Sequence, residues 1–390
     1  MTLACRLPAC ALGLMVAFAR LLLLALGLVL PLSLSLAGTA RATDYPLEIV
    51  DSIGRKVDIP KRPKAILLGT GFHLVAFSLI DPDPVSRLSG WSEDMKADNP
   101  EFYADFSARF PALDTLARID DGTGAGLSLE TLLTVPADLA LLANWQAETE
   151  AGRQAMAVLE QSGIPVIVLD FNSEPLVTTP QAMRLLGRIV DREAQAEAFA
   201  RLFEDKIALI RARVASASTP GPRVLLDAFP NPTPTHYAYG PGGLGMFLTL
   251  AGGRNIADGL PRPGGLISTE FMLAADPQVY IATSSPAGGY SHLTIGPGVS
   301  EERARQTLAE TVTAPMLAEL DAVKSGRVHG IWNFFNAVPL NVVAAEAFAV
   351  WLRPELFPDV DPQKTLDEIN SRFAAVPFRG AYWVSLDKHK

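Results

Sequence analysis

The sequence predicts an α/β protein of two Rossmann-like lobes, whose mostly parallel sheets are joined by one long helix and leave a ligand cleft between them. Three observations favour this fold. Short apolar runs alternate with helical patterns in both halves of the chain, which is typical of the crossover connections of parallel sheets. A long stretch with helical spacing lies between the halves. Finally, the phrase "LSLETLLTVPADLALLA" at 127–143 recurs in similar form as "ISTEFMLAADPQVYIAT" at 267–283, so both halves carry an equivalent segment.

Residues 1–42 have the layout of a secretory signal peptide. They contain three arginines and no acidic residue, with the apolar run Leu21–Leu30 followed by the small-residue stretch "SLAGTARA". Ala40 and Ala42 fit the positions before a cleavage at Thr43. A membrane anchor is the alternative, but the uninterrupted run of about ten residues is shorter than the roughly 20 that a spanning helix needs. We therefore expect export to the periplasm, with a more regular signal if translation starts at Met15.

Cysteine content and charge exclude several classes of function. Both cysteines, Cys5 and Cys10, precede the apolar run, so the exported chain would contain none. This excludes disulfides, a cysteine nucleophile, cysteine-ligated zinc and a lipid-attachment site in the exported chain. Loss of the three arginines leaves 30 basic against 42 acidic residues, a net charge of −12. Nucleic-acid binding is not expected, because it requires a basic surface.

The first lobe is expected over residues 43–177. It opens with a hairpin, because "LEIVD" and "KVDIP" alternate apolar and polar residues around "SIGR". The strands of a parallel sheet are then predicted at "KAILLG" (64–69), "VSRLSG" (85–90), "DLALLA" (138–143) and "PVIVLD" (165–170).

A helical segment over residues 178–217 is expected to join the lobes. Thr179 and Pro180 form a helix-start signal, and apolar spacing predicts a long helix over 192–215, ending in the breaker-rich "SASTPGP". A single rigid link predicts only a small hinge motion on ligand binding. The second lobe, residues 218–390, repeats the strand rhythm with "RVLLDA" (223–228), "QVYIAT" (278–283) and "RVHGIW" (327–332).

Each copy of the repeated phrase places a glutamate two residues after a serine. Ser128 and Ser268 are expected to cap short helices, so that Glu130 and Glu270 fall in the first helical turn. A carboxylate there stabilises a helix by about 0.3–1 kcal/mol, which would explain either glutamate alone. The occurrence of the pair, one in each lobe, favours a shared external role.

The repeated phrase resembles the paired helix starts of the periplasmic binding proteins that deliver ferric siderophores, haem or cobalamin to ATP-driven (ABC) importers. The resemblance extends over the exported chain, through the hairpin "EIVDSIGRKVDIP", the glycine-rich "GGLGMFLTLAGGRNIAD" (242–258) and "VPLNVVAAEAFAVWLRPELFPD" (338–359). It implies a monomer without cofactor or catalytic activity that passes an iron–siderophore complex to the transmembrane subunits of an ABC permease. It also implies that Glu130 and Glu270 dock onto permease arginines, and complementary charge favours correct encounter.

The ligand is expected at the loops beyond the carboxyl ends of the strands, which in open α/β lobes meet at one edge of each sheet. Those loops concentrate aromatic side chains, which suit a large and partly apolar chelate. Arg262 is the candidate counter-charge, and the scarcity of other arginines in these loops favours a neutral or weakly charged hydroxamate chelate over a triply anionic catecholate. The predicted ligand-binding residues are Phe72, His73, Trp91, Trp145, Tyr237, Tyr239, Arg262, Tyr290 and Trp332.

Several alternatives stay open. Haem or cobalamin could replace the siderophore, with a loop histidine or tyrosine as the axial ligand of haem iron. Direct binding of a metal ion is disfavoured, because the candidate histidines lack ligand spacing; these are His73, His236, His292 and His329. A secreted hydrolase would be expected to show a G-x-S-x-G elbow, which the sequence lacks. The glycine-rich "GPGGLG" (240–245) does not directly follow a strand, so it does not fit a dinucleotide-binding loop.

Overall fold

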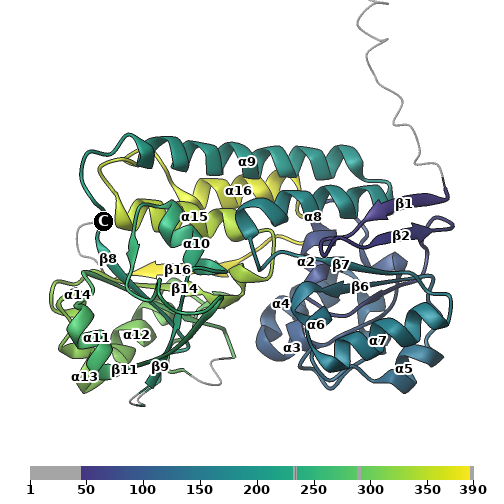
Figure 1. The fold of residues 1–390 in the computed structure, drawn as a ribbon, viewed down its shortest axis with the longest axis horizontal. Coiled ribbons are helices and arrows are strands. Elements are labelled where there is room, and N and C mark those ends of the chain that lie inside the picture. The colour runs from purple at the N-terminus through teal and green to yellow at the C-terminus, as the bar shows by residue number, and fades with distance from the viewer. Residues whose placement is uncertain (1–44, 232, 234, 288–290, 387–390) are drawn as a thin grey trace, which may run out of the picture. The chain divides into compact units, whose positions relative to one another are not determined.

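A computed structural model describes residues 45–386, apart from 232, 234 and 288–290 (Figure 1). The predicted signal peptide, residues 1–42, lies outside the described residues. Within the described part, no helix combines the length and the apolar character needed to cross a bilayer.

The first lobe contains the predicted hairpin and a parallel sheet. Strands β1 (Leu47–Val50) and β2 (Lys56–Ile59) pair antiparallel, as expected. Within residues 66–169, five parallel strands run in the order β5-β4-β3-β6-β7. Their bounds are β3 Ile66–Leu68, β4 Leu88–Trp91, β5 Ala117–Arg118, β6 Leu139–Ala143 and β7 Val166–Leu169. The strand expected from residue 85 begins only at Leu88, because Pro84 opens a 3₁₀ turn over Val85–Arg87.

Helices cover both faces of this sheet, and the shortest of them follow the carboxyl ends of the strands (Figure 1). They are α2 His73–Ser78, α3 Asp94–Asp98, α4 Pro100–Arg109, α5 Leu129–Thr134, α6 Asn144–Ala147 and α7 Glu150–Gln161.

Two helices, rather than one, occupy the linking region. Helix α8 spans Pro175–Val190 and α9 spans Glu193–Ala215, with Asp191 in the left-handed conformation at the turn between them. Helix α9 confirms the long helix predicted over 192–215. The helix start predicted at Pro180 is wrong, because α8 begins at Pro175 and Pro180 lies inside it. Proline at the first helical position loses no hydrogen bond, whereas Pro180 cannot donate to the carbonyl one turn earlier.

The second lobe has a sheet with a parallel centre and antiparallel edges. In its described part the strands run in the order β11-β9-β8-β12-β14-β16, and β10 pairs with β8. Strands β8, β12 and β14 are mutually parallel, while β9, β11 and β16 pair antiparallel. The bounds are β8 Arg223–Ala228, β9 Thr235–Tyr239, β10 Arg254–Asn255, β11 Gly264–Ser268, β12 Val279–Ser284, β14 Val328–Trp332 and β16 Trp383–Ser385. A separate short pair is formed by β13 Gly296–Pro297 and β15 Gly380–Ala381.

The helices of this lobe divide between the two faces of its sheet (Figure 1). They are α10 Leu244–Leu250, α11 Thr269–Ala275, α12 Glu301–Thr311, α13 Pro315–Ala318, α14 Asp321–Lys324, α15 Asn341–Leu352 and α16 Pro362–Arg372.

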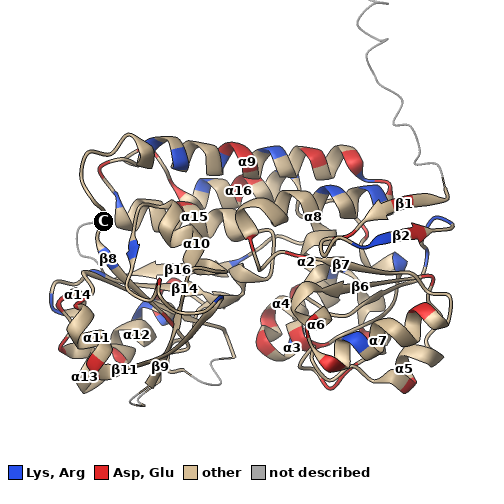
Figure 2. Ribbon diagram, viewed as in Figure 1, with Lys and Arg blue, Asp and Glu red and all other residues tan. Residues whose placement is uncertain are grey.

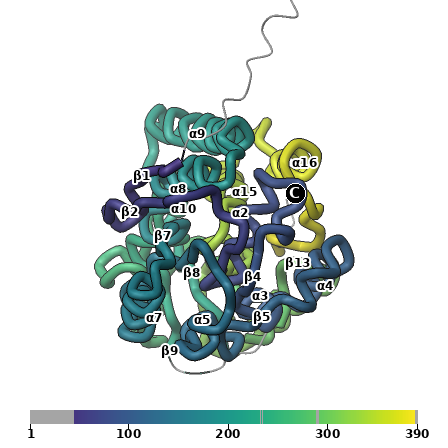
Figure 3. The backbone as a smooth tube through the Cα atoms, turned by 90° about the vertical axis from the view of Figure 1, so that its right-hand side faces the viewer, coloured from purple at the N-terminus to yellow at the C-terminus, as the bar shows by residue number. Residues whose placement is uncertain are grey.

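A helical layer of α8, α9, α15 and α16 extends across both sheets, and α9 lies on the outside of it in both views (Figures 1 and 3). Both signs of charge line α9 (Figure 2), and Arg184 of α8 forms ion pairs with Glu197 and Glu204 of α9. Beneath the layer, one hydrophobic core continues from Ile66 in the first sheet through Phe199 of α9 to Val224 in the second. The two lobes therefore share an interior, which limits their relative motion.

Candidate functional site

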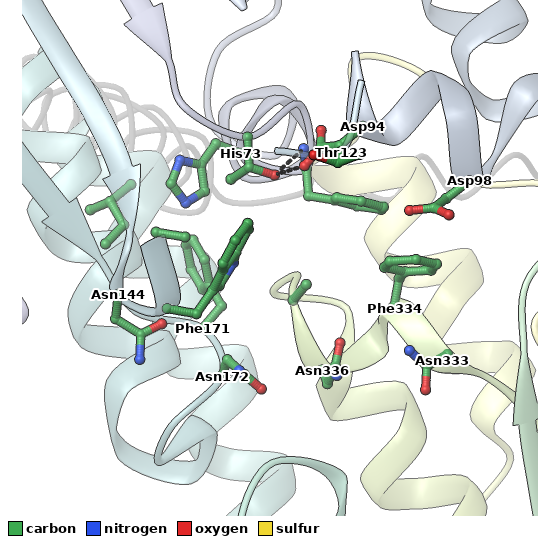
Figure 4. Close-up of a pocket in the computed structure, with 16 residues that line it drawn as sticks. His73, Asp94, Asp98, Thr123, Asn144, Phe171, Asn172, Asn333, Phe334 and Asn336 are labelled. Carbon is green, nitrogen blue, oxygen red and sulfur yellow. Dashed lines mark hydrogen bonds between the residues drawn. The ribbon is translucent and has the colours of Figure 1, made fainter. Parts of the chain in front are cut away.

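A cavity of about 220 Å³ lies where loops of the two lobes meet (Figure 4). The first lobe supplies residues at and beyond the carboxyl ends of β3, β4, β6 and β7, and the second lobe supplies the loop after β14. The lining residues are Thr70, Phe72, His73, Asp94, Asp98, Thr123, Ala143, Asn144, Trp145, Leu169, Phe171, Asn172, Asn333, Phe334, Asn336 and Ala337. This is the location in which α/β lobes bind ligands.

Aromatic rings form much of the cavity wall. Phe72 from the first lobe stacks on Phe334 from the second, with ring centroids 4.4 Å apart and planes 12° from parallel. Phe171 is buried, whereas Trp145 on α6 is half-buried. Gln146 fixes α6, because its side chain accepts from Ala143 N at 2.9 Å and donates to the Gly69 carbonyl at 2.7 Å.

Asp94 is a buried carboxylate whose hydrogen bonds organise the loops beside the cavity. Oδ1 accepts from the backbone N–H of Gly71 and Met95 at 2.7 Å each, and Oδ2 accepts from Thr70 Oγ1 at 2.5 Å. Burial outweighs these hydrogen bonds and raises the pKa of Asp94 to about 7. A side chain at Gly71 would meet Ser92 O at 2.7 Å, so this close approach requires glycine.

Asp98, at the end of α3, carries a carboxylate with no hydrogen bond or ion pair to any described residue. It is partly exposed and lines the cavity. Burial raises the pKa of Asp98 to about 6. The carboxylate is therefore ionised above that pH without a counter-charge from the described part of the protein.

His73 is buried against Phe171, with the two rings edge to face at 6.0 Å. Its Nδ1 has no hydrogen-bond partner. Burial lowers the pKa of His73 to about 3, so the imidazole is neutral at ordinary pH. Two amide oxygens at the cavity, Asn144 Oδ1 and Asn172 Oδ1, are likewise unpaired.

A second cavity of about 520 Å³ adjoins the first, and the two share Asn172 and Asn336. Tyr239 holds two asparagines in place where the cavities meet. Its hydroxyl donates to Asn333 Oδ1 at 2.8 Å and accepts from Asn336 Nδ2 at 3.1 Å. The lining is Asn172, Asp227, Ala228, Phe229, Pro230, Asn231, Thr233, Thr235, His236, Tyr237, Tyr239, Pro263, Leu266 and Asn336. Neither cavity has a lysine or arginine among the described residues that line it.

A buried polar cluster backs the second cavity. Asp227 Oδ2 lies 2.8 Å from His236 Nδ1 and accepts from the Tyr280 hydroxyl at 2.8 Å. Burial lowers the pKa of His236, but the hydrogen bond to Asp227 and the negative charge of that carboxylate together outweigh it, so the pKa lies above its ordinary value.

Five residues predicted as ligand contacts line these cavities: Phe72, His73, Trp145, Tyr237 and Tyr239. Three others lie elsewhere. Trp91 is buried and stacked on Tyr103 at 5.8 Å. Trp332 is in the core, and the exposed Arg262 forms an ion pair with Glu174 at 2.7 Å, which links the two lobes. Tyr290 lies outside the described residues.

The cavity also contains polar residues that the sequence had not singled out, namely Asp94, Asp98, Asn144, Asn172, Asn333 and Asn336. All but Asp98 lie in loops already expected at the cleft. An asparagine or aspartate just beyond a strand end could have indicated these residues in the sequence. The same loops are rich in aromatic residues, and the prediction followed those instead.

The two repeated serines cap helices as predicted. Ser128 accepts from Thr131 N at the start of α5, and Ser268 accepts from Phe271 N at the start of α11. Glu130 and Glu270 are exposed in the first turns. Both helices lie on the side of the molecule away from α9, one in each lobe (Figure 1). In the part of the chain that the structure describes, no three histidine, cysteine or acidic side chains converge as a metal site.

The fold and the cleft are those of a two-lobed solute-binding protein. The chain belongs to the periplasmic binding protein family, whose model matches residues 119–332. It is thus a periplasmic binding protein, and membership of this family implies a periplasmic location. No curated protein sequence matches the chain.

Solved structures share the fold at low sequence identity. The TroA-like periplasmic binding protein FepB from Veillonella parvula is 22% identical, with a TM-score of 0.76 over 88% of this chain and 100% of that one. The molybdate periplasmic binding protein MolA from Haemophilus influenzae is 16% identical, with a TM-score of 0.62 over 86% and 99%. A periplasmic heme-binding protein from Pseudomonas aeruginosa is 19% identical, with a TM-score of 0.54 over 77% and 94%. The last two of these proteins bind different ligands, molybdate and haem, so likeness of fold does not define the ligand.

Proposed function

We propose that this protein captures a ferric siderophore between its lobes and delivers it, as a monomer, to the membrane subunits of an ABC permease, after export directed by residues 1–42. The observation that carries the proposal is the pair of adjoining cavities with aromatic walls. Drug-sized ligands occupy pockets of about 300–1,000 Å³. The first cavity, at 220 Å³, is smaller than this and the second, at 520 Å³, falls within it. A large chelate would therefore occupy both.

The charge of the lining supports a hydroxamate chelate over a catecholate. A ferric tris-catecholate carries three negative charges, and the described lining offers no lysine or arginine to balance them. Buried charges without partners are costly. The same argument disfavours haem, whose two carboxylates would lie near the acidic side chains of Asp94 and Asp98. A hydroxamate chelate of neutral or positive charge incurs no such cost.

The residues proposed to touch the chelate are the five predicted ones that line the cavities. Arg262 is proposed to act at the rim, where its ion pair with Glu174 joins the lobes beside the second cavity. Both partners are about half exposed, so the pair contributes little stability. Trp91 and Trp332 are proposed to pack beneath the residues that line the cavities without touching the chelate.

Glu130 and Glu270 are proposed as the docking points for the permease. Exposed apolar side chains lie around each glutamate and would exclude water from the contact. Half of the large exposed hydrophobic side chains of the described chain belong to these two neighbourhoods: Leu129, Leu133, Leu266, Phe271 and Leu273. Glutamates on separate lobes fix the orientation of the docked protein, which one charge could not do.

Intrinsic fluorescence tests the ligand class. Purified protein should be titrated with ferric hydroxamates, ferric catecholates, haem and cobalamin, and we expect saturable quenching by the hydroxamates. Trp145→Phe should reduce the quenching amplitude, because Trp145 lines the first cavity. Trp383→Phe, outside both cavities, is the matched control and should keep it. Preferential binding of haem or cobalamin, or of none of these compounds, would reject the siderophore assignment.

A further inference from the structure

We propose that the 220 Å³ cavity holds a positively charged arm of the chelate, an alkylammonium group, with Asp98 as its counter-ion. This inference rests on the proposed capture of a ferric hydroxamate and assigns the chemistry of one end of that ligand. Four observations carry it: the unpaired carboxylate, the unpaired amide oxygens, the aromatic walls and the size of the cavity.

The carboxylate of Asp98 has no structural task in the described protein. The two acidic residues that precede it at the start of α3 are engaged. Asp94 holds three hydrogen bonds, and Glu93 pairs with Lys96 and Arg118. The carboxylate of Asp98 has neither a hydrogen bond nor an ion pair to a described residue. A partly buried carboxylate without a partner costs stability, and a cationic ligand would remove that cost.

Asp98 is also held in place by both lobes. Its carbonyl oxygen accepts from Ala287 N at 3.3 Å, and the adjacent Asn99 Oδ1 accepts from Trp332 Nε1 at 2.8 Å. Both donors belong to the second lobe. These bonds fix the backbone at Asp98, and its carboxylate lies beside the Phe334 ring, on one side of the cavity in Figure 4.

The rest of the lining suits a cation. Asn144 Oδ1 and Asn172 Oδ1 are acceptors without donors, whereas an ammonium group has three N–H donors and no acceptor. In Figure 4 both asparagines lie across the cavity from Asp98. The rings of Phe72, Phe171 and Phe334 would contact the alkyl stem, and a cation near their faces gains further attraction.

Cavity size then orients the ligand. The first cavity accommodates a small arm, and the adjoining 520 Å³ cavity accommodates the iron-containing body. The ligand class is thus a ferric hydroxamate with a terminal amine, bound with that amine towards the first lobe.

A matched pair of ligands tests the proposal. The ferric complex of a linear trihydroxamate with a free terminal amine should be compared at pH 7.5 with the same complex N-acetylated at that amine. We expect the protein to bind the amine form about 10- to 100-fold more tightly, the range of a hydrogen bond to a charged group. Asp98→Asn should abolish the preference, and Asp98→Glu should keep part of it. Asp105→Asn, which removes one negative charge from α4 outside both cavities, should leave it unchanged.

The possible results distinguish the cationic arm, the role of Asp98 and siderophore capture from one another. Equal affinity of the unmodified protein for the two complexes would overturn the cationic arm while leaving siderophore capture intact. A preference that survives Asp98→Asn would overturn the role of Asp98. Binding of neither complex would overturn siderophore capture as well. The comparison on the unmodified protein does not depend on whether a variant folds.

Discussion

The indole Nε1 of Trp332 donates a hydrogen bond to Asn99 Oδ1 at 2.8 Å, and this bond joins the two lobes through the interior of the molecule. Trp332 lies at the end of β14 and Asn99 lies between α3 and α4. Both side chains are fully buried, and the indole packs edge to face on Phe102, Phe335 and Tyr382. The base of the cleft is therefore part of the core.

Replacing Trp332 should destabilise the whole protein. Trp332→Phe removes the indole N–H and leaves Asn99, whose Nδ2 already has no partner, without its donor. It also leaves space where the larger ring was. We expect a loss of about 2–4 kcal/mol in the free energy of unfolding, measured by urea denaturation. Trp383→Phe, at a partly exposed position of β16, should cost less than half as much. Equal losses would mean that the cross-lobe bond contributes nothing.

Ligand binding should change the dimensions of the protein very little. The hydrophobic core runs without interruption from the first sheet through α9 to the second. Asn341 Nδ2 of the second lobe also donates to Thr179 Oγ1 of the linking helix α8 at 3.0 Å and to the Phe171 carbonyl of the first lobe at 3.5 Å. We expect the radius of gyration with and without bound chelate to agree within about 1 Å, as for pre-organised binding proteins. X-ray scattering measures this directly. A decrease of several ångströms would show a hinge that the core does not suggest.

The hairpin, the central strands and α9 could be predicted from the sequence because each depends on local pattern. The central strands are short, mostly apolar and largely buried runs, the hairpin alternates apolar and polar residues, and α9 has clear helical spacing. The short or edge strands were not predicted; these are β5, β9, β10, β11, β13, β15 and β16. The start of α8 could not be placed, since Pro175 and Pro180 both fit a helix start and packing against α9 decides between them. The strand at 85–90 was shortened by a proline whose effect depends on the turn around it.

The cleft could be located from the sequence but its lining could not. Trp332 ends β14 and Phe334 follows two residues later, yet Trp332 is buried in the core and Phe334 lines the cavity. Whether an aromatic ring in these segments faces the cavity or the core depends on how the opposite lobe packs against its backbone. Asp98 is the last residue of the one-turn helix α3, seven residues after β4 ends, and contacts with the second lobe hold the end of that helix. Such contacts leave no periodic trace in the sequence.

Reversing the charge of the two capping-turn glutamates should block transport without weakening ligand binding. Glu130→Lys and Glu270→Lys together would remove both carboxylates that we propose dock onto the permease. We expect uptake of labelled ferric chelate into cells to fall to background, while the fluorescence-derived Kd stays within about twofold, a difference below 0.5 kcal/mol. Each single reversal should give partial uptake.

A third serine-capped helix supplies a matched control for this double variant. In α12, Ser300 caps the helix and Glu302 occupies the same exposed first-turn position as Glu130 and Glu270. Glu302→Lys changes the helix electrostatics in the same way but outside the proposed docking surface. Uptake should therefore be normal. Loss of uptake in this variant, or loss of ligand affinity in the double variant, would count against the docking assignment.

Two buried groups at the cavity should give opposite contributions to the pH dependence of stability. The pKa of His73 falls from an ordinary 6.5 to about 3 in the folded protein. Between these values the unfolded chain binds the extra proton, so the His73 contribution weakens stability as pH falls. The pKa of Asp94 rises from an ordinary 3.8 to about 7. Between these values the folded protein binds the extra proton, so the Asp94 contribution weakens stability as pH rises.

Single variants should separate the two contributions, which nearly cancel between about pH 4 and 6.5 when both groups are present. The Asp94→Asn variant keeps only the His73 contribution, so its free energy of unfolding should rise with pH across this window. The slope should exceed that of the unmodified protein by up to about 1.4 kcal/mol per pH unit. In His73→Phe the change in slope should have the opposite sign and similar size. Urea unfolding at pH 4.5, 5.5 and 6.5 measures both slopes. The other acidic groups titrate equally in all three proteins, so they do not affect the comparison. If both variants changed the slope in the same direction relative to the unmodified protein, His73 and Asp94 would not have the pKa shifts that their burial implies.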